Sequence, residues 1–481
     1  MILSELLKEI EILEISAELD SEIGDISYDS RTVKPGDLFV AVKGFETDGH
    51  KYIESAVKKG ALAAVCEDRP RSGIPYILVK DSRRALALIS KNYFRDPASE
   101  ITMLGITGTN GKTTTTMLLK HVIEDCYGCK AGLIGTNQNL IGSHVLESAH
   151  TTPESYELQK LLREMSDCGC SHVIMEVSSH SLTLERVAGI HFEVAVFTNL
   201  TQDHLDFHNS IEEYAGAKAM LFEHCGFAAI NIDDEWGGYM LERAKCPVFT
   251  YSETKLAADL IAKDIRLSPT SVRFCVLAGD EIEMINLGIP GRFSVYNAMA
   301  VLAVTSLLNI PLADACEALK TAEGVKGRVE VVPTPEDFTI LIDYAHTPDA
   351  LENIISSMKE VSDGRVVLLF GCGGDRDKTK RPLMGKIATE LADYVIITSD
   401  NPRTEKPESI INDILEGVTA PKSRYTVIED RIKAIEYAID NHQQNDVIIL
   451  AGKGHETYQI IGKTKSHMDE REIVADYLGK K

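Results

Sequence analysis

The fold of this 481-residue chain is indicated by one stretch, Gly105-Ile106-Thr107-Gly108-Thr109-Asn110-Gly111-Lys112-Thr113-Thr114. The run in front of it, residues 101–106, is short and apolar, which predicts a buried strand. The residues behind it, 113–125, predict a helix. A glycine-rich turn between a strand and a helix, with Lys-Thr where the helix opens, is typical of a phosphate-binding loop.

Each residue type in this loop suits phosphate chemistry. Glycines allow backbone N–H groups to turn toward phosphate oxygens, and the N-terminus of the helix adds its positive end. Lys112 can neutralise β- and γ-phosphate charge, and the Thr113 hydroxyl can ligate Mg²⁺. A glycine-rich turn without a ligand is the simpler alternative. The loop alone leaves a switch GTPase, a transport ATPase, a kinase and a ligase open.

Outward from the loop, apolar runs that predict further strands recur at 38–42, 173–177, 194–198, 366–370, 394–398 and 447–450. Up to about residue 330 they alternate with helical stretches, which predicts an α/β fold with a parallel sheet covered by helices. The last three runs end in polar loops, at 371–375, 399–402 and 451–454. Because ligands of open parallel sheets bind beyond the carboxyl ends of strands, these loops predict a second site. Loops are polar in any case, which is the simpler interpretation.

Composition limits the class of protein. Fifty basic residues stand against 73 acidic ones, a net charge of −23, which argues against a nucleic-acid or membrane-surface partner. No run reaches the ~20 apolar residues of a membrane span. The first twenty residues show helical spacing without the pattern of a secretion signal. Ten scattered cysteines predict reduced thiols in the cytoplasm rather than disulfides. Zinc binding at Cys126-x-x-Cys129 or Cys168-x-Cys170 is disfavoured because neither spacing fits a zinc knuckle.

A second group of residues could hold metal. Glu176 ends an apolar strand, where phosphate-loop enzymes place a partner of Mg²⁺. The segment 203–208 offers two His and two Asp, including His204, although an ordinary surface loop would look similar. Lys218 lies in an apolar helical stretch, and its pattern alone is typical of a surface lysine whose ammonium reaches water.

Taken in order along nearly the whole chain, these segments resemble the Mur ligases. The resemblance rests on matches at Asp29-Ser30-Arg31, the phosphate loop, Thr151-Thr152-Pro153, the Glu176 and His204 segments, Ala217-Lys218, Tyr296-Asn297-Ala298, Gly327-Arg328-Val329-Glu330, Asp343-Tyr344-Ala345-His346-Thr347-Pro348, Gly374-Asp375-Arg376-Asp377, Asp400-Asn401-Pro402-Arg403 and Gly452-Lys453-Gly454-His455-Glu456. It implies three domains. These are a small α/β UDP-binding domain at 1–98, a central ATP-binding domain at 99–330 and a C-terminal Rossmann-like, amino-acid-binding domain at 331–481.

The resemblance also assigns roles to matching positions. It implies a catalytic set of Lys112, Glu176, His204 and Lys218. It implies ATP contacts at Gly108, Thr109, Asn110, Gly111, Lys112, Thr113, Thr114, Asn297, Arg328 and Asp343. Contacts to the UDP-muramoyl-peptide are implied at Ser30, Phe45, Glu46, Thr47, Thr151, Thr152, Ser178 and Arg186. Mg²⁺ ligands are implied at Thr113, Glu176, His204 and Lys218, with Lys218 carbamylated to an N6-carboxylysine.

The amino acid to be added is implied by a further set, Arg376, Asp400, Asn401, Pro402, Arg403, Gly452 and Glu456. Paired arginines suit the distal carboxylate of meso-diaminopimelate, and Glu456 suits its distal ammonium. The expected reaction is therefore ATP-dependent ligation of meso-diaminopimelate to the D-glutamate side chain of UDP-N-acetylmuramoyl-L-alanyl-D-glutamate, by a monomer.

Alternatives and departures accompany this expectation. The enzyme rivals are a relative that adds L-lysine or ornithine and a folate polyglutamate ligase, which would lack the Asp29-Ser30-Arg31 domain. A non-catalytic nucleotide-binding relative is the rival from another class. His150 and Leu184 stand where relatives commonly have Asn and Gln, which puts the peptide contacts beside them in doubt.

Overall fold

The structure is a computed structural model that describes residues 1–44, 47–71, 73–148, 150–203, 207–334 and 337–479. The chain divides into two compact units, Met1–Leu260 with Ala300–Pro311, and Ile261–Met299 with Leu312–Lys481. The division falls inside helix α9 (Arg292–Leu307), and each unit is described by itself. The domain boundaries expected after residues 98 and 330 stay predictions.

The first hundred residues form a small α/β layer. Its elements are α1 (Leu3–Leu6), β1 (Ile12–Ile15), β2 (Ile26–Ser27), β3 (Leu38–Val40), η1 (Gly49–Tyr52), α2 (Ile53–Lys58), β4 (Ala63–Cys66), β5 (Tyr76–Val79), α3 (Ser82–Tyr93) and η2 (Pro97–Glu100). The sheet order is β1-β5-β4-β3-β2, with β1 antiparallel and the other pairs parallel. Asp81 caps the N-terminus of helix α3, because its carboxylate accepts hydrogen bonds from the N–H groups of Arg83 and Arg84.

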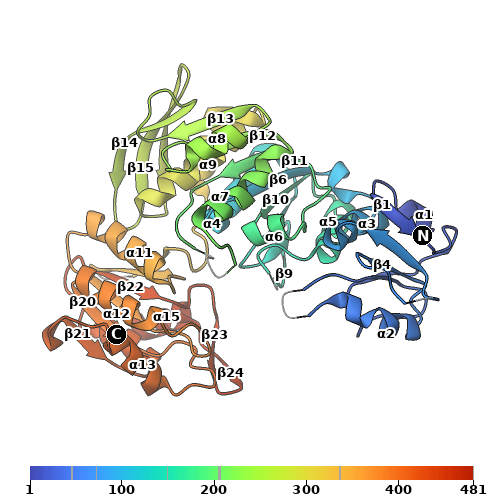
Figure 1. The fold of residues 1–481 in the computed structure, drawn as a ribbon. Coiled ribbons are helices and arrows are strands. Elements are labelled where there is room, and N and C mark those ends of the chain that lie inside the picture. Colours follow the sequence, from blue (N-terminus) through green and yellow to red (C-terminus); the bar gives the residue numbers. More distant parts are fainter. Residues whose placement is uncertain (45–46, 72, 149, 204–206, 335–336, 480–481) are drawn as a thin grey trace. The chain divides into compact units, whose positions relative to one another are not determined.

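The rest of the first unit is a larger sheet with helices (Figure 1). Its elements are β6 (Thr102–Thr107), α4 (Lys112–Tyr127), β7 (Ala131–Ile134), β8 (Asn139–Ile141), β9 (His144–Leu146), α5 (Ser155–Asp167), β10 (His172–Glu176), α6 (Ser179–Thr183), β11 (Phe192–Phe197), α7 (Ile211–Ala219), η3 (Met220–Glu223), β12 (Cys225–Asn231), α8 (Gly237–Arg243) and β13 (Val248–Ser252). In this unit the strand order is β13-β12-β11-β6-β10-β7-β8-β9. Strands β13 to β7 are parallel, so the loops after β6, β10 and β11 meet at one edge.

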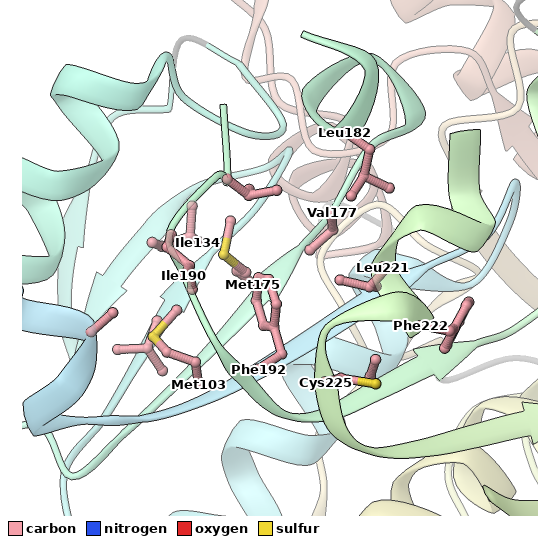
Figure 2. Close-up of a cluster of buried hydrophobic side chains, with 14 of the residues drawn as sticks. Met103, Ile134, Met175, Val177, Leu182, Ile190, Phe192, Leu221, Phe222 and Cys225 are labelled. Atoms are coloured by element: carbon pink, nitrogen blue, oxygen red, sulfur yellow. The ribbon is translucent and has the colours of Figure 1, made fainter. Parts of the chain in front are cut away.

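The core of this sheet explains why the strands read as nearly continuous apolar runs. Met103, Met175 and Phe192 lie on neighbouring strands and are almost fully buried. Figure 2 shows them packed with Leu182 of α6 and Leu221 of η3. A parallel sheet covered on both faces leaves no strand position for water, so its residues are apolar on both sides.

The second unit is built around a six-stranded sheet and also holds strands outside that sheet. Its elements are β15 (Val272–Ala278), β16 (Glu281–Leu287), α10 (Leu312–Thr321), β17 (Glu330–Val332), β18 (Thr339–Asp343), α11 (Pro348–Val361), β19 (Val366–Phe370), α12 (Lys380–Leu391), β20 (Tyr394–Ile397), α13 (Pro407–Leu415), η4 (Lys422–Arg424), β21 (Tyr425–Val427), α14 (Arg431–Asp440), β22 (Val447–Ala451), β23 (Tyr458–Ile461), β24 (Thr464–His467) and α15 (Glu470–Leu478). The order is β17-β18-β22-β19-β20-β21, parallel except for β17. Strands β23 and β24 form a separate antiparallel hairpin.

Two expectations about the elements were wrong in part. Helical spacing over the first twenty residues yields only the short α1, because Ile12–Ile15 pairs with β5 as a strand. The alternation of strands and helices up to residue 330 is interrupted by β14 (Leu260–Leu267), β15 and β16, and β15 pairs with β16 antiparallel. The first miss arises because β1 pairs with a strand that is distant in sequence, whereas β15 and β16 form a local hairpin joined at Gly279-Asp280. Within the described residues, no helix is long and apolar enough to cross a membrane.

Candidate nucleotide and substrate sites

The phosphate loop joins β6 to α4 as predicted. Gly108 and Gly111 have φ values of 151° and 86°, which residues other than glycine rarely adopt. A Cβ atom on Gly108 would lie 1.9 Å from Thr198 Oγ1. Lys112 Nζ donates to the carbonyl oxygens of Gly108 and Thr109 at 2.7 and 2.8 Å. The glycines therefore bring the loop against the end of β11, with its lysine folded over it.

Residues after β11 hold the loop from the other side. Asn110 N donates to Asn199 Oδ1 at 2.9 Å, and Thr198 Oγ1 donates to the Asn110 carbonyl at 2.7 Å. Thr109 N donates to the Asn199 carbonyl at 2.9 Å. Thr113 and Thr114 are buried in the first turn of α4. These bonds fix the backbone of the loop, and they occupy the N–H groups of Thr109 and Asn110.

Glu176 lies at the carboxyl end of β10 and is 1% exposed. Its Oε1 accepts the Thr113 hydroxyl at 2.9 Å and the Thr136 N–H at 2.9 Å, while Thr136 Oγ1 donates to its Oε2 at 3.0 Å. The structure thus brings together two predicted metal ligands, Thr113 and Glu176. Hard oxygen donors beside a phosphate loop fit Mg²⁺.

Lys218 is buried, so the interpretation as a surface lysine was wrong. The residue is 1% exposed on α7, where Tyr214, Ala215, Ala217 and Ala219 are also buried. Lys218 Nζ donates to the Gly108 carbonyl at 2.8 Å and lies 4.4 Å from the centre of the Tyr214 ring. Burial lowers the pKa of Lys218 well below its usual value, and the positive charge of Lys112 lowers it further.

The remaining member of the predicted metal set, His204, lies outside the described residues. His208, four residues further on, is buried, and its Nε2 shares a hydrogen bond of 3.0 Å with Ser179 Oγ. In the part of the chain that the structure describes, no group of three or more His, Cys, Asp or Glu residues is placed to hold a metal. All ten cysteines are free thiols, as expected.

The residues expected to contact the muramoyl-peptide gather around the end of β10. Thr152 Oγ1 donates to the Glu176 carbonyl at 2.7 Å, and Ser178 N donates to Thr152 Oγ1 at 3.2 Å. Arg186 Nη1 donates to the Thr152 carbonyl at 3.1 Å. The hydroxyls of Thr151 and Thr136 share a hydrogen bond of 3.0 Å. This group therefore adjoins the Glu176 carboxylate.

The other expected contacts of this substrate lie in the first hundred residues. The carbonyl of Ser30 accepts a bond of 2.8 Å from Lys59 Nζ, which fixes the turn after β2. The Thr47 hydroxyl shares a hydrogen bond of 3.2 Å with that of Tyr52. Phe45 and Glu46, predicted for the same site, lie outside the described residues.

In the second unit, the expected nucleotide contacts Arg328 and Asp343 lie close together. The buried Asp343 carboxylate accepts the N–H groups of Val329 and Ala345 at 2.9 and 2.8 Å. Burial raises the pKa of Asp343, while the Arg328 guanidinium opposes the rise. Arg328 also lies 5.1 Å from the centre of the Tyr344 ring. Asn297 is buried in α9.

The predicted amino-acid site is built from loops that follow β19, β20 and β22. A Cβ atom on Gly373 would lie 2.9 Å from Arg403 Nη1 and 3.8 Å from Arg376 Cγ, so both arginines border the same glycine. Arg403 Nη1 donates to the Gly374 carbonyl at 2.8 Å, whereas Arg376 is exposed. A Cβ atom on Gly374 would lie 1.9 Å from the Pro402 carbonyl oxygen.

The loop after β22 completes this arrangement. Gly452 has φ 109°, and a Cβ atom there would lie 2.7 Å from Asp400 Oδ2. Glu456 Oε2 accepts from Asn401 Nδ2 at 2.7 Å. The structure therefore brings all seven predicted residues of this site to one edge of the sheet, as the positions of the strand ends implied.

Two residues of these sites had no predicted role. Thr136 binds Glu176, and its only sequence signal is its place just after β7. Lys453 Nζ donates to Glu456 Oε2 at 3.1 Å and is 0% exposed. In the sequence, Lys453 is a charged residue between two glycines at a strand end, a pattern that predicts a solvent-exposed side chain.

Comparisons with known proteins match most of the chain to a single family. The Mur ligase middle domain matches residues 106–305, the Mur ligase glutamate ligase domain 327–454, and the Mur ligase family catalytic domain 22–94. The UDP-N-acetylmuramoyl-L-alanyl-D-glutamate–2,6-diaminopimelate ligase of Caldanaerobacter subterraneus subsp. tengcongensis is 52% identical over 469 residues, covering 97% of this chain and 96% of the relative.

Solved structures give the same picture. A structure of UDP-N-acetylmuramoyl-L-alanyl-D-glutamate–2,6-diaminopimelate ligase has 32% identity and a TM-score of 0.76, with 100% of this chain and 99% of that chain covered. MurF ligase from Thermotoga maritima in complex with ADP has 19% identity and a TM-score of 0.60, with 96% and 98% covered. The second likeness concerns the fold alone.

Proposed function

The chain belongs to the Mur ligase family, and we propose that it uses ATP to join meso-diaminopimelate to UDP-N-acetylmuramoyl-L-alanyl-D-glutamate in peptidoglycan synthesis. The bond forms between the D-glutamate side-chain carboxylate and an amine of the incoming amino acid. Relatives that match nearly the full length are named UDP-N-acetylmuramoyl-L-alanyl-D-glutamate–2,6-diaminopimelate ligase, which supports this choice of substrates.

One observation carries the choice of amino acid. Arg376 and Arg403 flank Gly373 from two different loops, and Arg403 is held there by its bond to the Gly374 carbonyl. Guanidinium groups bind carboxylates through paired, charge-assisted hydrogen bonds. Meso-diaminopimelate has a distal carboxylate for them to bind, whereas L-lysine and L-ornithine have none. This supports diaminopimelate over the two alternatives.

The first unit supplies groups for carboxylate activation. The phosphate loop binds the ATP phosphates through its N–H groups, and Lys112 offsets the charge that gathers as the γ-phosphoryl group moves to the D-glutamate carboxylate. Thr113 Oγ1 and Glu176 Oε1, which lie 2.9 Å apart, would hold Mg²⁺. When bound, Mg²⁺ supplies positive charge beside the β- and γ-phosphates.

The acyl phosphate is then open to attack by the neutral amine of diaminopimelate. The amine nitrogen bonds to the carbonyl carbon to give a tetrahedral intermediate, which loses a proton from that nitrogen to water and expels inorganic phosphate with the electrons of the broken C–O bond. Thr151, Thr152, Ser178 and Arg186 are proposed to position the peptide carboxylate, because they surround the carbonyl end of Glu176. The acyl phosphate would hydrolyse in bulk water, so the reaction requires that water be excluded while it exists.

Lys218 is proposed to act as a carbamate. A neutral amine is the form that adds CO₂, and burial favours the neutral form of this lysine. The product carries a carboxylate on a long side chain, which replaces a cation that would repel Mg²⁺ with an anionic ligand. His204 is the proposed companion of this ligand.

We also infer the compartment in which the enzyme acts and one class of partner that it does not bind. We place it in the cytoplasm, because ten free thiols suit a reducing compartment. We expect no nucleic-acid partner, since the net charge is −23.

An ADP-release assay with ATP, Mg²⁺ and the muramoyl-dipeptide nucleotide tests the function. Meso-diaminopimelate, L-lysine and L-ornithine are compared as acceptors. We expect release to depend on diaminopimelate and to stop when EDTA removes the metal. Faster release with L-lysine than with diaminopimelate would move the protein to the lysine-adding branch, and no acceptor-dependent release would contradict ligase activity.

A further inference from the structure

Lys453 is a buried cation inside the proposed amino-acid site. Its side chain is 0% exposed, and Nζ donates to Glu456 Oε2 at 3.1 Å and to Asn401 Oδ1 at 3.3 Å. Asn401 Nδ2 donates to the same Glu456 oxygen at 2.7 Å. A carboxylate oxygen with two such donors is fixed in place, and its charge is largely compensated before any substrate arrives.

The β23–β24 hairpin connects Lys453, Glu456 and Asn401 to Arg403, which lies in the loop after β20. Asn401 Oδ1 also accepts from Ile460 N at 2.9 Å. Arg403 N donates to the Ile460 carbonyl at 3.1 Å, and Gly462 N donates to the Arg403 carbonyl at 2.6 Å. These bonds hold Arg403 at φ 51°, a conformation that residues other than glycine adopt rarely. Lys453, Asn401 and Arg403 are therefore parts of one rigid framework.

The cations of this framework are already paired with acidic groups. Lys453 donates to Glu456, and Asp375 lies close enough to Arg403 for their charges to interact. The distal end of meso-diaminopimelate carries one carboxylate and one ammonium, whereas that of L-lysine is a lone ammonium. A Glu456 carboxylate that Lys453 already compensates attracts the lone ammonium weakly, while the arginines can still bind the distal carboxylate of diaminopimelate.

We propose that Lys453 is a specificity-determining positioning residue. Its ammonium competes with the distal ammonium of a substrate for Glu456, a cost that the arginine contacts to the distal carboxylate of diaminopimelate offset and that L-lysine cannot offset. This inference rests on the proposed function and deepens it, because it adds a repulsive element to the attractive pair of arginines. Discrimination by repulsion as well as attraction is a general way in which binding sites reject close analogues.

The test compares acceptors in the ADP-release assay. We expect Lys453→Met to lower kcat/KM for meso-diaminopimelate and to raise it for L-lysine, so that the preference for diaminopimelate falls about tenfold or more. Lys453→Arg should keep most of the preference, because it keeps the charge. The matched control is Lys422→Met, since Lys422 is an exposed lysine in η4, outside this framework. This control should leave both kcat/KM values unchanged.

A second variant separates specificity from stability. Glu456→Gln leaves Lys453 uncompensated, so the preference for diaminopimelate over L-lysine should rise rather than fall. In Lys453→Met/Glu456→Gln the unpaired carboxylate is gone, and the gain with L-lysine should disappear. Thermal unfolding of each variant shows whether it is folded. If Lys453→Met does not fold, the opposite shift in Glu456→Gln and the double variant still decide the matter.

Different results overturn different claims. An unchanged ratio of the two kcat/KM values in Lys453→Met and in Glu456→Gln, with both values falling in parallel, would show a purely structural role for Lys453. That outcome leaves the ligase activity standing. A wild-type enzyme that does not use diaminopimelate would overturn the proposed function itself, before any variant is compared.

Discussion

Lys218 shows how one buried side chain changes the interpretation of a site. In sequence it resembles a lysine on the surface of a helix, but its Nζ lies 2.8 Å from the Gly108 carbonyl beneath the phosphate loop. A protonated amine there would stand beside Lys112 and near the proposed metal. Burial and Lys112 both lower its pKa, which favours the uncharged, reactive amine.

Lys218→Ala should lower the ADP-release rate by about a hundredfold or more, because the proposed anionic ligand of Mg²⁺ is removed. Added short carboxylates such as acetate should restore part of the rate. The control, Lys245→Ala, removes an exposed lysine paired with Glu223 and should keep full activity. Full activity in Lys218→Ala would remove the carbamate from the mechanism.

Lys112→Ala should abolish ADP release that depends on both substrates. Lys112 is the residue of the phosphate loop that offsets charge on the β- and γ-phosphates, and a loss of about a thousandfold is typical of such groups. Lys160→Ala, at an exposed position of α5, is the matched control. Normal turnover in Lys112→Ala would show that the nucleotide binds elsewhere.

At the scale of elements, an ion-pair cluster joins α12 to α13 below the amino-acid site. Arg381 is 0% exposed, and it donates to both oxygens of Glu405 and to Asp413 Oδ2. The hydrogen bonds from Arg381 lower the pKa of Glu405 to about 2 from 4.5. Arg381 also donates to the Gly373 carbonyl at 3.2 Å, so the cluster supports the loop that carries Arg376.

This cluster predicts a pH-dependent stability. The folded carboxyl is more acidic than the unfolded one, so its stabilisation is present above pH 4.5 and is lost as the pH falls toward about 2. Glu405→Gln should therefore lower Tm at neutral pH, and the difference from wild type should shrink through this window. Glu408→Gln, at an exposed position of α13, serves as the control in the same calorimetric series. A Tm difference that is constant across the window would contradict the pairing.

At the scale of the molecule, charge and composition bear on assembly. A net charge of −23 on 481 residues disfavours association of identical chains through charge repulsion. Sedimentation equilibrium at low ionic strength should therefore give a mass near 52.9 kDa. A mass near twice this value at micromolar concentration would contradict the expectation of a monomer.

Much of the fold and of the site could be predicted from sequence, and most misses have a common cause. Strand β6, the phosphate loop and α4 are local patterns, so their positions were predicted within one or two residues. The pairing of β1 with β5, the burial of Lys218 and the contact of Lys453 with Asn401 depend on partners far away in sequence, whereas β15 and β16 are joined by a short turn. Local patterns of hydrophobicity cannot register such partners.

The order of residues was enough to predict which chemical groups are present: a phosphate loop, acidic and basic residues at strand ends, and two arginines suited to a distal carboxylate. Only the packing of distant segments shows which of these groups are desolvated and which share a partner. Lys218 and Lys453 are both lysines in unremarkable local sequence, yet each is fully enclosed and bonded to a site residue. Burial strengthens electrostatic interactions and shifts the favoured protonation state, and it is a property of packing rather than of sequence order.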